Sequence, residues 1–189
     1  MLSAFILAGG RSSRMGRDKA SLELQGHTLL DRALSLAREL TPDVLTVGPG
    51  RDLEDAYFGC GPLAGIHAAL RATSADLNLI LAVDTPFLHA GLLRFLVKEA
   101  EQGSAVVTLP RVAGRLHPLC AVYRRAFAAT AETALAAGRY KIDALFAGVS
   151  TRILEESELR GLDFAPNMFD NLNTPEDWQA AQQRAGDKR

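Results

Sequence analysis

Residues 5–19 read FILAGGRSSRMGRDK, so that a short apolar run passes directly into a glycine-rich, basic segment. Paired glycines after an apolar strand let backbone N–H groups approach an anion closely. Three arginines and one lysine follow within ten residues of Gly9. The stretch therefore predicts a phosphate-binding loop at the end of a buried strand, in preference to a surface loop that is merely basic.

This loop differs from the two commonest phosphate-binding loops. A P-loop has four residues between its glycines and a Lys followed by Ser or Thr. Here five residues lie between Gly10 and Gly16, and Ala20 follows Lys19. A dinucleotide-binding turn needs G-x-G-x-x-G at the start of a helix, which the sequence after Gly9 does not provide.

Apolar runs recur along the chain and alternate with helix-like stretches. The strand-like runs are Ala4–Ala8, Val44–Val47, Leu79–Val83 and Ala105–Leu109. The helix-like stretches are Leu29–Glu39, Leu63–Ala72, Ala90–Glu101, Arg124–Ala137 and Lys141–Phe146. Continuous apolar runs are typical of buried, mostly parallel strands. The alternation predicts an α/β fold with a doubly wound, mostly parallel sheet and helices on both faces. We expect residues 1–189 to form a single Rossmann-like domain, with residues 184–189 frayed.

Composition and charge limit the partners of the chain. Lys and Arg number 21 against 22 Asp and Glu, and the formal net charge of −1 argues against bulk electrostatic binding to nucleic acid. No apolar run approaches the length of about 18 residues that a membrane span needs, and no signal-peptide pattern opens the sequence. Cys60 and Cys120 form no C-x-x-C pattern. We therefore expect a cytoplasmic protein without a nucleic-acid or membrane partner.

Asp84 is the first candidate for a metal ligand. Ligands of open α/β sheets bind beyond the carboxyl ends of the strands. Asp84 follows the apolar run 79–83, so its carboxylate would lie at the rim of the sheet, where Mg²⁺ bridging phosphate oxygens needs an oxygen ligand. The alternative, that Asp84 or Thr85 caps the next helix or shapes the turn before Pro86, stays open.

Asn171 and Asn173 could offer amide oxygens to a metal or ligand at a second strand end. The four residues after them, Thr-Pro-Glu-Asp at 174–177, are typical of a helix start, with a hydroxyl N-cap, Pro at the first helical position and acids in the first turn. Capping accounts for these four residues and leaves both asparagines without an explanation.

Two further features each have a functional and a structural interpretation. The segment 61–65, Gly-Pro-Leu-Ala-Gly, opens a helix whose N-terminus could receive part of a nucleotide, but Gly65 could instead pack closely against a strand. His117 could contact a substrate, although a lone His is more often structural or exposed. The absence of a Ser-His-Asp pattern or a G-x-S-x-G elbow gives no support for a covalent hydrolase.

Four motifs carry a resemblance to a known family. They are Leu7-Ala8-Gly9-Gly10-x-Ser12-x-Arg14-Met15-Gly16-x-Asp18-Lys19, Gly61-Pro62-Leu63-Ala64-Gly65, Asp84-Thr85-Pro86 and Asn171-Leu172-Asn173-Thr174-Pro175-Glu176. In order and spacing they resemble the molybdenum cofactor guanylyltransferases of the MobA type. The related cytidylyltransferases usually read L-A-A-G in the first motif, so Gly10 favours the guanylyl branch.

The resemblance implies roles for individual residues. Lys19 would contact the phosphates of GTP, Asp84 would bind both GTP and Mg²⁺, and Arg14 would join them in catalysis. The GTP site implied by the resemblance comprises Leu7, Ala8, Gly9, Gly10, Lys19, Asp55, Gly61, Gly65 and Asp84. The residues implied on the pterin side are His117, Asn171 and Asn173. The family often has Asn near the end of the second strand, and this chain departs from that pattern with Thr-Val-Gly at 46–48.

The resemblance also implies a reaction and its partners. A terminal phosphate oxygen of molybdopterin would attack the α-phosphorus of GTP in line, and pyrophosphate would leave. The implied cofactor is Mg²⁺, and molybdopterin would be delivered by a cofactor-synthesis or acceptor protein. A related transferase that uses CTP and a non-catalytic nucleotide-binding protein remain as alternatives. Such a transfer depends mainly on positioning and charge neutralisation, which Lys19, Arg14 and the backbone of Gly9 and Gly10 can supply.

Overall fold

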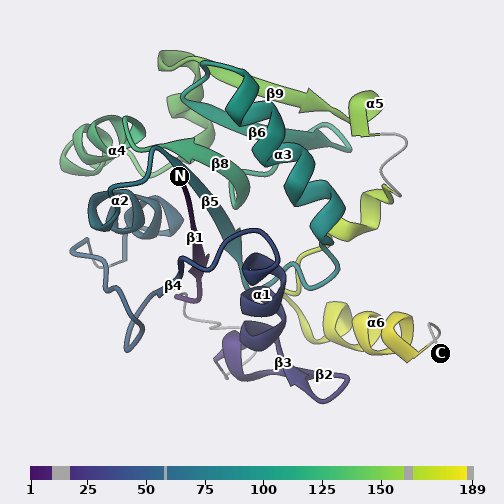
Figure 1. The fold of residues 1–189 in the computed structure, drawn as a ribbon. Helices are drawn as coiled ribbons and strands as arrows, with labels where there is room; N and C mark the ends of the chain where they lie inside the picture. The colour runs from purple at the N-terminus through teal and green to yellow at the C-terminus, as the bar shows by residue number, and fades with distance from the viewer. Residues whose placement is uncertain (10–17, 58, 160–163, 187–189) are drawn as a thin grey trace.

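The computed structural model describes residues 1–9, 18–57, 59–159 and 164–186. Helices cover both faces of a central sheet (Figure 1). The strands are β1 (Leu2–Leu7), β2 (Glu23–Leu24), β3 (His27–Thr28), β4 (Val44–Val47), β5 (Leu77–Ala82), β6 (Val107–Val112), β7 (Arg115–Leu116), β8 (Cys120–Arg124) and β9 (Thr151–Glu155). The helices are α1 (Leu29–Arg38), α2 (Pro62–Ala72), α3 (Ala90–Gln102), α4 (Phe127–Ala136), α5 (Glu156–Leu159) and α6 (Pro175–Gly186). The 3₁₀ segments are η1 (Lys19–Ser21), η2 (Ile142–Gly148) and η3 (Pro166–Phe169).

The main sheet has seven strands in the order β4-β1-β5-β8-β6-β7, with β9 beside β6. β4 and β5 run parallel to β1, and β9 runs parallel to β6. β8 lies antiparallel between β5 and β6, and β7 is antiparallel to β6. The predicted α/β class with a mostly parallel sheet is therefore confirmed. Among the described helices, none is both long and apolar enough to cross a membrane.

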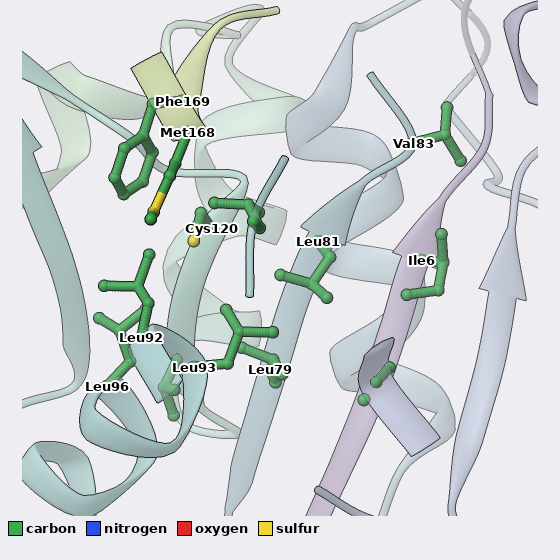
Figure 2. Packing of buried hydrophobic residues seen from close by; sticks show 14 of the residues in the cluster. Ile6, Leu79, Leu81, Val83, Leu92, Leu93, Leu96, Cys120, Met168 and Phe169 are labelled. Atoms are coloured by element: carbon green, nitrogen blue, oxygen red, sulfur yellow. The ribbon is translucent and has the colours of Figure 1, made fainter. Parts of the chain in front are cut away.

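The two faces of the sheet carry separate cores because side chains alternate along each strand. On β1, Ile6 joins the cluster beneath α1, α3 and α6, whereas Phe5 joins the cluster beneath α2 and α4. Figure 2 shows three leucines of α3 packed over β5 in the first cluster, together with Met168 and Phe169 of η3. Cores on both faces hold β1 and β5 in place, and the candidate site begins where these two strands end.

β8 corrects the sequence analysis, which started a helix at Arg124. Arg124 is instead the last residue of a strand, and α4 begins at Phe127. The Arg124 guanidinium donates to the carbonyl oxygens of Ala100, Gly103 and Ala105 at 3.0, 2.8 and 3.1 Å. These bonds tie the end of β8 to the end of α3. The run was missed because most of its strand pairing is with β5, which is distant in the sequence.

The end of the chain also differs from expectation. Residues 184–186, which were expected to belong to a frayed tail, lie in α6, whereas 187–189 lie outside the described part. Arg184 donates to the backbone carbonyl and the side-chain oxygen of Asn167 at 2.7 and 2.8 Å. Its guanidinium carbon also lies 4.0 Å from the centre of the Phe87 ring, a cation–π contact. A smaller correction concerns the helix expected at Lys141–Phe146, which is the 3₁₀ segment η2.

Candidate active site

The carboxyl ends of β1, β4 and β5 meet at one edge of the sheet. The ladder continues past the end of β5, because the amide of Val83 donates to the carbonyl of Leu7 at 3.3 Å. Gly9 and Asp84 therefore leave the sheet from neighbouring strands. This is the crevice in which an open α/β sheet binds its ligand.

The backbone is packed very closely at Gly9. Gly48, the first residue after β4, has a φ of +144°, and a Cβ added there would lie 2.7 Å from the amide nitrogen of Gly9. A Cβ on Gly9 would in turn lie 3.1 Å from the Cα of Gly48 and 3.2 Å from the Cδ of Pro49. The departure from the family pattern at 46–48 thus has a steric consequence, since no side chain fits at position 48 without moving Gly9.

Lys19 joins residues from two distant parts of the chain. Its Nζ donates to Oδ1 of Asn173 at 2.7 Å and lies 3.4 Å from Oδ2 of Asp84. The Lys19 and Asp84 side chains are 18% and 21% exposed, so a ligand can reach both. Three residues predicted from three separate motifs are therefore brought together, and we call them the Lys19 cluster.

The start of α6 places Asn173 in this cluster. Oδ2 of Asp177 accepts from the backbone amides of Asn173 and Thr174 at 2.9 and 2.8 Å, and these bonds lower the pKa of the Asp177 carboxyl. The Asp177 amide donates to Oγ1 of Thr174 at 3.1 Å, which confirms the predicted helix start. The amide of Leu172 donates to the carbonyl of Asp84 at 2.9 Å. Capping therefore uses the backbone at Asn173 and leaves its side chain for Lys19.

Asp18, a member of the first motif, and Arg51 are near the site, but neither was given a role from the sequence. Oδ1 of Asp18 accepts from the Ala20 amide at 3.0 Å and so caps η1, the turn that carries Lys19. Oδ2 of Asp18 accepts from Nη2 of Arg51 at 2.9 Å. An acid just before a helical turn is a local signal for the cap. No local signal connects Arg51 to it, because the two residues are 33 positions apart.

Asp55 carries a buried oxygen that fits a ligand. Its Oδ1 is buried and has no hydrogen-bond partner in the described structure. Buried polar atoms nearly always have a partner in folded proteins. This oxygen can accept from an N–H or O–H group of a bound molecule, which agrees with the GTP contact that the resemblance implied for Asp55.

The two glycines of the α2 motif have different surroundings. Gly61 has a φ of +71° and precedes Pro62 at the helix start, so it provides a left-handed turn without a side chain. A Cβ on Gly65 would lie 3.2 Å from Cδ2 of Leu7 and 3.8 Å from Cγ1 of Val47. Close packing against β1 and β4 accounts for Gly65, and its contact with GTP stays a prediction.

Leu7 and Ala8 are buried, at 7% and 8% exposure. The Leu7 side chain belongs to the core beneath α2. A nucleotide at this edge would therefore meet the backbone of these two residues and of Gly9, which is exposed.

His117 lies near the same edge of the sheet. The carbonyl of Leu119, two residues on, accepts from the Ala82 amide at the end of β5 at 3.1 Å. The His117 ring packs on Phe169 with 4.3 Å between the ring centres, just before Asn171 in sequence. Burial lowers the pKa of His117 below its ordinary value of 6.5, which favours the neutral imidazole. The structure thus joins His117 to the segment that leads to both asparagines.

The remaining predicted residues are less defined. Gly10 and Arg14 lie outside the described residues, and their roles stay predictions. Asn171 is exposed, two residues before Asn173. In the described ranges, no three His, Cys, Asp or Glu residues gather in a group that could hold a metal. The oxygens of Asp84 and Asn173 still fit Mg²⁺, because this ion prefers hard oxygen ligands and keeps several waters.

Comparison with known proteins finds a matching family model, a relative similar in sequence and two solved structures similar in fold. A family model described as a MobA-like NTP transferase domain matches residues 4–152. The molybdenum cofactor guanylyltransferase of Syntrophotalea carbinolica is 32% identical over 190 residues, which cover 94% of this chain and 89% of that protein. The molybdopterin-guanine dinucleotide biosynthesis protein A of Archaeoglobus fulgidus has a TM-score of 0.86 and 26% identity, covering 99% of this chain and 100% of its own. The 2-C-methyl-D-erythritol 4-phosphate cytidylyltransferase of Thermus thermophilus, at 22% identity and a TM-score of 0.72 over 97% of this chain and 98% of its own, shares the fold.

Proposed function

The chain belongs to the family of MobA-like NTP transferase domains, and on that premise we propose that it transfers GMP from GTP to the terminal phosphate of molybdopterin. The products are pyrophosphate and the guanine dinucleotide form of the molybdenum cofactor. Molybdopterin arrives from a cofactor-synthesis or acceptor protein, and the reaction takes place in the cytoplasm. The names of the relative in Syntrophotalea carbinolica and of the structural neighbour in Archaeoglobus fulgidus support this choice of substrates.

The Lys19 cluster is the observation that carries the proposal. A single ammonium group lies 2.7 Å from Asn173 and 3.4 Å from Asp84, at the edge where the sheet receives ligands. Asn173 belongs to the motif assigned to the pterin side and Asp84 to the motif assigned to GTP. Lys19 therefore lies where the two substrates have to meet.

The reaction needs no nucleophile from the protein. A terminal phosphate oxygen of molybdopterin forms a bond to the α-phosphorus of GTP, while the bond from that phosphorus to the bridging oxygen of pyrophosphate breaks. Negative charge grows on the leaving pyrophosphate, and the Lys19 ammonium stabilises it electrostatically. Oδ1 of Asn173 orients this ammonium. The exposed backbone at Gly9 lets the triphosphate approach the end of β1 closely.

Magnesium belongs to the proposal as the cofactor. Asp84 would hold it by a carboxylate oxygen, and Asn173 offers an amide oxygen nearby. The ion would supply positive charge that neutralises part of the negative charge on the phosphates. Asp84 is suited to this role because its ion pair with Lys19 is long, at 3.4 Å, and leaves the carboxylate free to bind a further cation.

Pyrophosphate release tests the proposal. The purified chain is incubated with Mg²⁺, a molybdopterin-bearing protein and either GTP, CTP or ATP. We expect release with GTP, and only when the pterin is present. Arg94→Ala serves as the matched control with normal activity, because Arg94 of α3 pairs on the exposed surface with Glu39, which follows α1.

Three outcomes would contradict the proposal. Release with CTP alone would assign the chain to the cytidylyl branch. Release with GTP but without pterin would remove molybdopterin as the acceptor. Binding of GTP without any release would favour a non-catalytic nucleotide-binding protein.

A further inference from the structure

The loop formed by residues 48–53 is held in one shape by hydrogen bonds to its own strand, β4. Oδ2 of Asp52 accepts from the amide and the hydroxyl of Thr46 at 2.8 and 2.7 Å, and these bonds lower the pKa of the Asp52 carboxyl. The amide of Leu53 donates to the carbonyl of Thr46 at 3.0 Å, and the amide of Gly48 donates to the carbonyl of Leu53 at 2.9 Å. The loop is therefore a fixed projection from the sheet, and we call it the β4 loop.

The β4 loop contacts both ends of the glycine-rich segment. At one end, Gly48 lies against the backbone of Gly9 so closely that a Cβ would not fit. At the other end, Nη2 of Arg51 donates to Oδ2 of Asp18 at 2.9 Å. The amide of Arg51 donates to the carbonyl of Gly48 at 3.1 Å, which fixes one contact relative to the other. One rigid loop thus sets the positions of both Gly9 and Asp18.

Asp18 passes this constraint to Lys19. Its second oxygen, Oδ1, accepts from the Ala20 amide at 3.0 Å, so one carboxylate joins the β4 loop to the turn η1. The Arg51 side chain is 22% exposed, and its Nε is buried without a partner among the described residues. Most of the Arg51 side chain is therefore buried, and its guanidinium is held at Asp18 instead of extending into solvent. An exposed ion pair contributes little to stability. The pair of Arg51 and Asp18 therefore matters mainly because it restricts the position of Lys19.

We propose that Arg51 is a positioning residue for nucleotidyl transfer, which acts through Asp18 to hold Lys19 in place. The proposal rests on the function given above, because it needs Lys19 to act on phosphate. Arg51 itself makes no contact with substrate in this role. A shift of about 1 Å in a charge-stabilising group can reduce turnover by as much as about 100-fold, so a loose η1 has a measurable effect.

The kinetic test compares Arg51→Ala with the matched control Arg94→Ala in the pyrophosphate assay, using whichever nucleotide the wild type accepts. We expect Arg51→Ala to lower kcat about tenfold with KM changed less than about threefold, and Arg94→Ala to leave both unchanged. Arg51→Lys should recover most of kcat, because a lysine can still pair with Asp18. In a Lys19→Ala background, Arg51→Ala should cause no further loss, since Arg51 acts only through Lys19.

Hydrogen exchange gives a readout that does not depend on activity. The Ala20 amide should exchange faster in Arg51→Ala than in the wild type, and at an unchanged rate in Arg94→Ala. The inference is overturned if Arg51→Ala leaves kcat unchanged, or if it leaves the exchange rate of the Ala20 amide unchanged. It is also overturned if Arg51→Ala lowers kcat equally in the wild-type and Lys19→Ala backgrounds. If the wild type releases no pyrophosphate with GTP, CTP or ATP, the proposed function fails. Hydrogen exchange alone then decides whether Arg51 holds η1.

Discussion

Replacing Gly48 by alanine tests the close approach of β4 and β1 at the site. The added Cβ would lie 2.7 Å from the amide nitrogen and 2.8 Å from the Cα of Gly9, and both are backbone atoms that cannot rotate away. Overpacking of this kind costs about 1–3 kcal/mol. The φ of +144° adds backbone strain of about 1–3 kcal/mol for any residue with a side chain. We therefore expect Gly48→Ala to lower the free energy of unfolding by about 2–6 kcal/mol.

Gly50→Ala is the matched control, because it lies in the same loop. Its φ is +66°, and a Cβ there would meet nothing within 4 Å. The expected loss is only the strain of a left-handed residue, about 1 kcal/mol. The difference between the two variants therefore reports the contact with Gly9 together with any extra backbone strain at the φ of +144°.

Urea unfolding measures both variants, and thermal unfolding gives a second estimate, at about 2–4 °C per kcal/mol for a chain of this size. GTP binding should also weaken in Gly48→Ala, because relief of the clash moves Gly9 away from its place at the end of β1. If Gly48→Ala and Gly50→Ala lose the same stability, the steric reasoning about Gly9 is wrong.

Three further predictions concern single side chains. Lys19→Ala should reduce turnover by about 100-fold or more, as expected for loss of one preorganised charge-stabilising group, and near-normal turnover would remove Lys19 from the mechanism. Asp84→Asn should raise the Mg²⁺ concentration needed for half-maximal activity without a large change in the urea midpoint; an unchanged metal titration would exclude Asp84 as the ligand. Burial lowers the pKa of His117 from its ordinary value of 6.5, so the unfolded chain binds more protons below that pH and stability should fall as the pH drops from 7 toward 5. His117→Phe should make this fall smaller, and an unchanged pH dependence would show that the buried imidazole does not cause it.

The sequence predicted those parts of the site that carry local signals. The apolar run before Gly9, the acid after the run 79–83 and the helix start at 174–177 each have a physical signature within a few residues. Resemblance added Asp55, which has no such signature, and its unpartnered buried oxygen is visible only in the structure. The packing of Gly65 against Leu7 was one of two interpretations of the sequence, and coordinates were needed to support it.

Features that depend on distant partners could not be predicted. Most of the pairing of β8 is with β5, so residues 120–123 were assigned to no element and Arg124 was taken as the start of the following helix. The pairing of Arg51 with Asp18 joins two surface-type residues that the sequence keeps 33 positions apart. Arg184 looked like part of a solvated tail because nothing nearby in sequence indicates Phe87 or Asn167 as its contacts. In each case tertiary contacts decide the role of the residue.

The contact between Lys19 and Asn173 spans 154 positions, and this has a consequence for the order of folding. During synthesis, Lys19 leaves the ribosome early, and the strands from β1 to β9 can emerge and pair before Asn173 emerges. The family model matches residues 4–152, so it covers most of the sheet but not the asparagine. The Lys19 ammonium can therefore be fully oriented only after the last helix has docked. A nascent chain that ends before Asn173 and α6 could form the sheet edge proposed to bind the nucleotide. It would still lack the hydrogen bond from Lys19 to Asn173.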